Sequence, residues 1–507
     1  MRNLGMKAFR TLYTLLFGVA VLLFFGLAYP HHLHYQEQYQ LFLFDSSYVW
    51  DIIKIPGGIA DLLGRFCTQF FLFAWIGALI IAVLLMVVQL LTLRLVNWGR
   101  FYGLSFVPSF LLWFFLLDEN ALLGGVWAVL LTLLASWLFD LLSEGWLRRI
   151  LLIVAVPVLY WMVGPICVVF FLLQALHLKR KEWSWYYAVL VLLTINVPLL
   201  LSFYLPVQAG SQWYGIHYYR YPTVIPVRLW VAGLSVVVLI LIVRAFYRWA
   251  NSSNNKVMAL VSFVLVAACM GCLVWENSNF KAEKVMKYDF MARYQQWNRI
   301  LETIQKEKPN NQISVTVQNL ALGMHGMLSE HLFDYNQNGI LGLLPDVGTD
   351  AISPMPTSEA FYQLGMISIA QRTAFEAQEA ILDFQKSARC YKRLAQTNLI
   401  LGNYKVARKY LMALQKTLFY REWATETLPL LGNEKAIAKH PEYGRLRQFA
   451  YKENFFFGDH VGPEMLESLY FSNTDNRLAY EYLKAYYILT GDRENYTKLL
   501  LHTSSKQ

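Results

Sequence analysis

The sequence predicts an all-α protein made of a polytopic membrane domain over residues 1–275 and an extracytoplasmic helical domain over residues 276–507. Two observations lead to this prediction. Hydrophobic residues make up 56% and aromatic residues 16% of the chain, which is more than soluble globular proteins contain. Solid apolar runs end near residue 275, and beyond that point polar residues alternate with apolar ones at helical spacing.

About nine spans are expected in the membrane domain, since a spanning helix needs roughly 20 apolar residues. Suitable runs lie at residues 10–29, 70–93, 101–117, 121–141, 184–205, 227–247 and 257–275. Residues 150–178 form a longer run that Gly164-Pro165 interrupts, so we expect two short helices that meet at the outer surface. Residues 10–29 could instead belong to a signal peptide, but the lack of a small-x-small cleavage site favours an uncleaved span.

Charge orients these spans. Residues 1–275 carry 17 Lys and Arg against 9 Asp and Glu. Since the whole chain has 44 Lys and Arg and 34 Asp and Glu, residues 276–507 carry 27 basic and 25 acidic residues. With nine spans the basic loops, including Lys179 to Lys181, all fall on the cytoplasmic side, and with eight they do not. We therefore expect a cytoplasmic N-terminus and an extracytoplasmic second domain. The net charge of +10 belongs mainly to the membrane domain, where it meets anionic lipid, and does not indicate nucleic-acid binding.

Part of the second domain resembles a tetratricopeptide repeat. Residues 388–419 place the following residues at the spacing of one such unit: Tyr391, Leu394, Ala395, Gly402, Tyr404, Ala407, Leu411 and Leu414. Weaker echoes at residues 294–309 and 480–496 predict a short solenoid with a concave face. The segment from Asn336 to Pro356 is rich in Asn, Gly, Asp and Pro, and we expect a loop there.

Carboxylates are scarce in the membrane domain, and a carboxylate in or beside lipid usually has a function. Glu37 and Asp45 lie in the first outer loop, which spans residues 31–69, and Asp118 and Glu119 lie in the short second outer loop. The predicted topology places both loops on one side of the membrane. We expect these four acids to form a catalytic cluster.

The third outer loop, residues 206–226, carries aromatic and basic residues that allow two interpretations. They form either an ordinary aromatic belt or a site in which an Arg binds phosphate while rings stack on a sugar. The residues concerned are His217, Tyr218, Tyr219 and Arg220. His34 of the first loop is either a solvated residue at headgroup level or a support for a neighbouring carboxylate, and residues 59–66 have the pattern of an interfacial helix.

This layout resembles that of the GT-C glycosyltransferases, which use polyprenyl-phosphate-linked sugars and include oligosaccharyltransferases and protein O-mannosyltransferases. The shared features are a long first outer loop with an early acid at Glu37, an acidic pair at Asp118-Glu119 and an extracytoplasmic C-terminal domain. A strict Asp-x-Asp motif is absent from the first loop. Residues 31–226, especially residues 37–42 and 217–222, also resemble an uncharacterised family of Bacteroidota inner-membrane proteins. This resemblance implies a bacterial inner membrane and a periplasmic second domain.

The resemblance implies a reaction in which Glu37 is the base or the acid that orients a metal, with Asp118 and Glu119 completing the acidic cluster. Arg220 and His217 would hold the phosphate. Magnesium or manganese at Glu37 and Asp118 would suit oxygen ligands if a metal takes part. The acceptor would be a protein bound by the helical-repeat domain.

Two other classes of function stay open. One is a membrane-anchored scaffold whose repeats bind envelope proteins, although an anchor needs one span rather than nine. The other is a lipid or solute transporter, for which ionisable groups near the middle of the membrane would be expected.

Overall fold

The computed structural model describes residues 2–95, 98–143, 145–177, 185–203, 210–246, 256–346, 352–381, 385–451 and 462–504. The chain divides into two compact units, Met1–Phe280 and Lys281–Gln507. Both are helical, and among the described residues the β-structure consists of one isolated bridge between Ala121 and Tyr219. The division falls slightly after residue 275, because the Phe280 ring packs against Trp275 and Tyr29.

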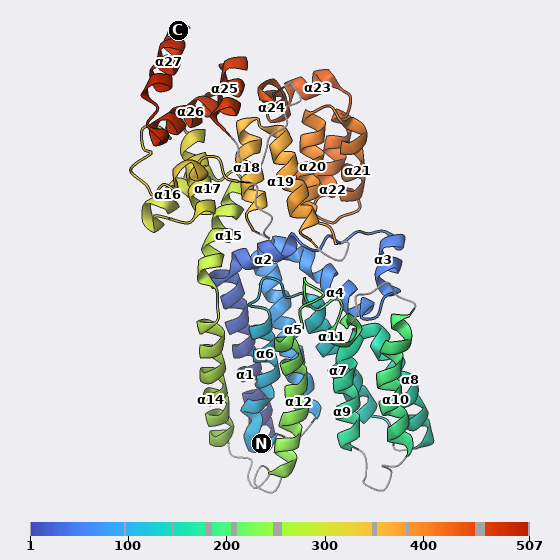
Figure 1. Ribbon diagram of the computed structural model, residues 1–507. Helices are drawn as coiled ribbons and strands as arrows, with labels where there is room; N and C mark the ends of the chain where they lie inside the picture. The colour runs from blue at the N-terminus through green and yellow to red at the C-terminus, as the bar shows by residue number, and fades with distance from the viewer. Residues whose placement is uncertain are drawn as a thin grey trace. The chain divides into compact units, whose positions relative to one another are not determined.

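The first unit is a bundle of long helices (Figure 1). Its elements are α1 Arg2–Leu23, η1 Phe24–Ala28, α2 Pro30–Glu37, α3 Ser46–Ile53, α4 Gly58–Thr68, η2 Gln69–Leu72, α5 Ala74–Leu95, η3 Gly99–Phe106, α6 Val107–Phe115, α7 Leu123–Asp140, α8 Trp146–Val163, η4 Gly164–Ile166, α9 Cys167–His177, α10 Trp185–Ser202, α11 Ser211–Tyr214, α12 Val227–Ala245 and α14 Lys256–Glu276. Helices α2, α3, α4 and α11 lie at the end of the bundle opposite the N-terminus, which we call the distal end.

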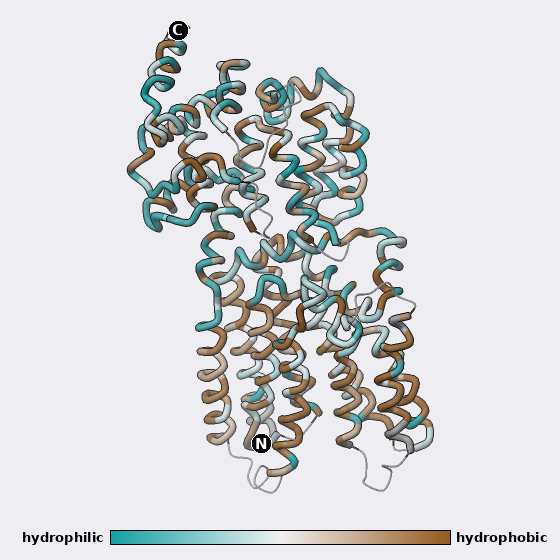
Figure 2. Tube along the Cα trace, viewed as in Figure 1, coloured by the Kyte–Doolittle hydropathy of each residue, from teal (hydrophilic) through white to brown (hydrophobic). Residues whose placement is uncertain are grey.

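Six segments of this unit are long and apolar enough to cross a membrane: Ala8–Ala28, Ala74–Leu95, Leu123–Asp140, Trp146–Leu176, Val227–Ala245 and Val257–Glu276. Figure 2 shows apolar residues along these helices. Two shorter apolar helices are Phe101–Phe115 and Val189–Leu200. The 31-residue segment Trp146–Leu176 contains the expected interruption, which separates α8 from α9. Nine spans remain a prediction, and the basic residues 179–181 lie outside the described residues.

The interior of the bundle is apolar with a few satisfied polar links. Helix α1 packs against α5, and the side chains of Phe17 and Val21 on α1 are buried in the core. The Thr14 hydroxyl donates to Gln89 Oε1 over 2.9 Å, and Gln89 Nε2 donates to the Ser105 hydroxyl over 3.0 Å. Buried polar side chains in apolar helices need such partners. The first apolar segment is therefore an integral part of this core.

The second unit consists of shorter helices. Its elements are α15 Phe280–Arg293, α16 Trp297–Glu307, α17 Gln312–Met324, η6 Gly339–Gly342, α18 Pro354–Leu364, α19 Ile367–Glu379, α20 Ala388–Ile400, α21 Tyr404–Leu414, α22 Arg421–Thr427, η7 Leu428–Leu430, α23 Glu434–Lys439, α24 Tyr443–Phe449, α25 Pro463–Ser472, α26 Arg477–Thr490 and α27 Arg493–Ser504. Among its described residues the expected loop, Asn336 to Pro356, contains the short η6 and the first three residues of α18, which begins at Pro354; residues 347–351 lie outside the description.

The predicted repeat at residues 388–419 is a helical hairpin. Helices α20 and α21 pack together, and Ala395 and Ala407 are fully buried. Gly402 joins the helices with a φ of +82°, a conformation that glycine adopts without strain. The same pairing of consecutive helices recurs for α16 with α17, α18 with α19 and α25 with α26. These pairs are compatible with a helical-repeat domain, and the tetratricopeptide assignment stays a prediction.

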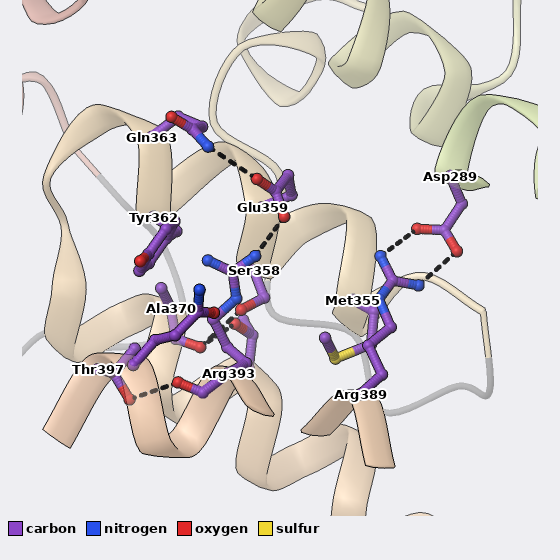
Figure 3. Close-up of polar contacts among 12 residues, drawn as sticks. Asp289, Met355, Ser358, Glu359, Tyr362, Gln363, Ala370, Arg389, Arg393 and Thr397 are labelled. Atoms are coloured by element: carbon purple, nitrogen blue, oxygen red, sulfur yellow. Dashed lines mark hydrogen bonds and ion pairs between the residues drawn. The ribbon is translucent and has the colours of Figure 1, made fainter. Parts of the chain in front are cut away.

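Buried ion pairs join the helices of the second unit (Figure 3). The Arg389 guanidinium binds both carboxylate oxygens of Asp289, over 2.6 Å and 2.7 Å. Arg393 on α20 pairs with Glu359 on α18, and its guanidinium carbon lies 3.7 Å from the centroid of the Tyr362 ring. A bidentate Arg–carboxylate pair fixes distance and orientation together. These pairs therefore set the registry of α15 and α18 against α20.

Candidate functional site

The first two of the predicted outer loops meet at the distal end. His32 Nε2 on α2 lies 3.0 Å from the carbonyl oxygen of Leu116, and Gln36 Nε2 donates to the carbonyl oxygen of Ala121 over 3.1 Å. Burial lowers the pKa of His32 to about 4, so its neutral ring donates to this carbonyl. Helix α2 is thus fixed on the turn between α6 and α7, which contains Asp118 and Glu119.

The third outer loop pairs with the same turn. Leu122 N donates to the carbonyl oxygen of Tyr218 over 3.1 Å, and Arg220 N donates to that of Asn120 over 2.8 Å. These two bonds form the bridge between Ala121 and Tyr219. The three loops therefore converge, which their predicted placement on one side of the membrane allowed but did not decide.

Asp118 is at the centre of this convergence. Its Oδ2 accepts from the Tyr219 hydroxyl over 3.0 Å and its Oδ1 accepts from Asn120 N over 3.0 Å. Burial and the Asp118 charge raise the pKa of Tyr219. The phenol therefore stays protonated and donates a hydrogen bond to Asp118. The Glu119 charge makes a smaller contribution in the same direction at Tyr219 and at Tyr35. Asp118 therefore binds a tyrosine of the third loop directly, whereas Glu119 acts on tyrosines of the other loops through its charge.

Arg220 follows Tyr219 in the third loop, and its guanidinium is buried between aromatic rings. Only 4% of the residue is exposed, and its guanidinium carbon lies 3.8 Å from the Tyr39 ring centroid and 5.5 Å from that of Tyr221. This is the geometry of a cation–π contact. Tyr39 of the first loop and Tyr221 of the third loop thus contact the cation, and Tyr221 does not belong only to an exposed belt.

Three further predicted residues occupy different places in the first loop. Glu37 is 4% exposed at the end of α2, next to Gln36. Asp45 caps α3, and its Oδ1 accepts from Ser47 N over 2.9 Å, which gives this acid a local structural role. His34 Nδ1 lies 3.1 Å from the carbonyl oxygen of Phe71, so the ring is buried against η2 and not solvated at headgroup level.

Tyr218 connects the third loop to the interruption between α8 and α9. Its hydroxyl donates to the carbonyl oxygen of Val163 and accepts from Ile166 N over 3.3 Å. Gly164 has a φ of +74°, and a Cβ there would lie 2.7 Å from the Tyr218 hydroxyl. Only glycine suits both the conformation and the space. Tyr218 therefore has a positioning role at this turn.

A buried ion pair on α4 was not predicted. Arg65 Nε donates to Asp61 Oδ2 over 2.8 Å, and the two residues are 7% and 1% exposed. His217 Nδ1 lies 3.7 Å from the same carboxylate oxygen. The polar face of α4 is buried while Phe66 is exposed, so the predicted interfacial helix is amphipathic with its polar face inside. The sequence signal that could have indicated this ion pair was the i, i+4 spacing of Asp61 and Arg65, with Gly64 on the same helix face.

Helix α4 approaches α7 very closely at two glycines. A Cβ on Gly64 would lie 2.4 Å from Gly124 N, and one on Gly124 would lie 3.1 Å from the carbonyl oxygen of His217. This contact places Asp61 beside the third loop. His217 consequently lies with Asp61, whereas Arg220 lies with Tyr39.

Among the described residues, no three His, Cys, Asp or Glu side chains gather in a way that could hold a metal ion. A magnesium or manganese ion at Glu37 and Asp118 remains a prediction.

Comparisons with known proteins identify a family but no function. No curated protein and no solved structure matches the chain. Residues 6–506 match the model of a family of unknown function, DUF6057, and the match covers both units. The chain is therefore a member of the DUF6057 family.

Proposed function

We propose that this protein is a membrane glycosyltransferase of the GT-C type. It moves a sugar or glycan from a polyprenyl-phosphate-linked donor to an acceptor outside the cytoplasm, and the favoured acceptor is a protein hydroxyl. The observation that carries the proposal is the convergence of Asp118, Tyr219 and the buried Arg220 where three outer loops meet. Acids and a buried cation at one end of an apolar helix bundle suit a donor with a lipid tail and an anionic headgroup.

The chemistry needs a proton acceptor and stabilisation of the departing phosphate. Glu37 or Asp118 would accept the proton of the acceptor hydroxyl. Glu119 would add a further negative charge to the acidic cluster. Tyr219 orients Asp118 through its hydrogen bond. Arg220 would neutralise charge on the phosphate as the glycosidic bond breaks. Glu37 and Asp118 would also be the ligands of a divalent cation, if the reaction uses one.

The proposed setting is a bacterial inner membrane crossed nine times. The N-terminus is then cytoplasmic, and the distal end and the second unit are periplasmic. Counting α8 and α9 as separate crossings, together with the two shorter apolar helices, gives this number. The helix pairs of the second unit would bind or orient the protein acceptor.

Glycoprotein profiling of a deletion strain tests this proposal. The strain is complemented with wild type, Glu37→Gln, Asp118→Asn or Asp51→Asn at matched protein level. Asp51 is the control, because its side chain is 66% exposed on α3 and pairs with the neighbouring Lys54 at the surface. We expect glycans to be lost with Glu37→Gln and Asp118→Asn and kept with Asp51→Asn.

The same experiment separates the competing functions. Unchanged glycans in the deletion strain would contradict the enzyme and favour the scaffold. Loss of glycans in the deletion that both acid variants restore fully would contradict catalysis at the distal end.

A further inference from the structure

The cluster of Asp61, Arg65 and His217 contains buried polar atoms that the described residues do not satisfy. Asp61 Oδ1 and both ring nitrogens of His217 have no hydrogen-bond partner among these residues. His217 Nδ1 is 3.7 Å from Asp61 Oδ2, which is longer than a hydrogen bond. Asp61 is 1% and His217 is 7% exposed. Leaving such buried groups without a partner is destabilising, so the cluster favours a ligand that forms hydrogen bonds with them.

The charge of the cluster excludes an anion as the favoured ligand. Arg65 already balances Asp61, with its Nη2 2.7 Å and its Nε 2.8 Å from Asp61 Oδ2. Burial lowers the pKa of His217, Arg65 lowers it further and Asp61 opposes the change, so the ring is neutral at pH 7. Tyr48 on α3 contributes a phenol near Arg65. The cluster is neutral overall, and this argues against the predicted role of His217 in holding phosphate.

The unsatisfied atoms match a hydroxyl group. The carboxylate oxygen accepts a hydrogen bond, and a neutral imidazole offers one N–H donor and one acceptor nitrogen. A hydroxyl both donates and accepts, and neighbouring sugar hydroxyls present these functions in pairs. Phosphate at neutral pH mainly accepts and carries charge that the cluster does not balance.

We propose that Asp61 and His217 form a binding site for the hydroxyl groups of a neutral sugar. The assignment rests on the proposed function, since the sugar would be part of the lipid-linked donor. His217 is three residues before Arg220 on the loop that the bridge at Tyr219 fixes. Sugar and phosphate would then be recognised by two separate parts of one loop.

The test uses full-length protein in lipid nanodiscs with isotope-labelled histidine rings, observed by solid-state NMR. The His217 signal is the one that His217→Asn removes. The probes are farnesyl phosphate and farnesyl phosphates that carry mannose, glucose, galactose or N-acetylglucosamine. At least one sugar-bearing probe should shift the His217 signal and bind about tenfold more tightly than farnesyl phosphate, while His217→Asn should abolish this preference. His331 is the control, because it is exposed and paired with Asp334 over 2.7 Å.

The outcomes distinguish this inference from the proposed function. If farnesyl phosphate shifts His217 as much as its sugar derivatives do, or if no probe shifts it, the sugar site is refuted. If a sugar derivative shifts His217 but glycan transfer depends on neither Glu37 nor Asp118, the sugar site stands and the glycosyltransferase proposal fails.

Discussion

The contact between Gly64 and Gly124 gives the sharpest structural prediction for the distal end. In Gly64→Ala the new Cβ would lie 2.4 Å from Gly124 N and 2.7 Å from Gly124 Cα, whereas ordinary contact begins at 3.4 Å. Both neighbours are backbone atoms, so no side chain can rotate away. Helix α4 must therefore retreat by about 1 Å, and overpacking of this kind costs about 1–3 kcal/mol. Asp61, on the preceding turn, moves away from His217 with the helix.

Thermal unfolding of the full-length protein in detergent measures this effect. We expect Tm to fall by several degrees for Gly64→Ala, since 1 kcal/mol corresponds to about 2–4 °C in domains of similar size. The matched control is Gly271→Ala on α14, where a Cβ meets nothing within 4 Å and alanine favours the helix. An unchanged Tm in Gly64→Ala, together with an unchanged His217 NMR signal, would refute the close packing of α4 on α7.

Three further predictions concern buried polar groups. Asp289→Asn leaves the Arg389 charge unbalanced and should destabilise the second unit by about 3–5 kcal/mol, measured as an earlier unfolding transition. Tyr219→Phe removes the 3.0 Å bond to Asp118 and should lower glycan transfer about tenfold at unchanged Tm. The unfolded pKa of His32 is about 6.5 and the folded value about 4, so the unfolded chain binds the extra proton. Stability should therefore fall by about 3 kcal/mol as the pH drops through this window, and His32→Gln should flatten the curve.

Each of these predictions has a contradicting result. Unfolding of Asp289→Asn at the wild-type temperature would show that the ion pair contributes little. Equal transfer by Tyr219→Phe and wild type would remove this phenol from the site, with Tyr221→Phe as the neighbouring control. The same pH dependence in His32→Gln as in wild type would assign the acid sensitivity to another group.

Apolar runs predicted the main helices because hydrocarbon burial and helix length are local properties of the sequence. The run at residues 121–141 agrees closely with α7, and Gly164-Pro165 predicted where α8 ends. The run at residues 101–117 differs, since its first part is the 3-10 helix η3 and α6 begins only at Val107. Hydropathy alone does not reveal such changes in helix type.

The predicted topology indicated which loops could contribute to the site. The charge pattern predicted that the loops lie on one side of the membrane, because alternate connections share a side, but it did not predict whether they converge. Side-chain partners were not predictable in this way. Asp61 and Arg65 have the spacing of an ordinary surface pair, and their burial depends on α7 and on His217, which are distant in the sequence. Asp45 is a carboxylate in the first loop, as expected of a catalytic acid, but its side chain caps α3.

Transfer of labelled sugar from lipid to protein by the purified protein tests the central claim most directly. Full-length wild type, Asp118→Asn and Asp51→Asn are reconstituted in liposomes with a lipid extract of native cells whose sugars carry a radioactive label, together with periplasmic proteins as acceptors. We predict that wild type and Asp51→Asn transfer label from lipid to protein, whereas Asp118→Asn transfers little. Equal transfer by all three proteins, or none by wild type with fully folded protein, would contradict glycosyl transfer at the distal end.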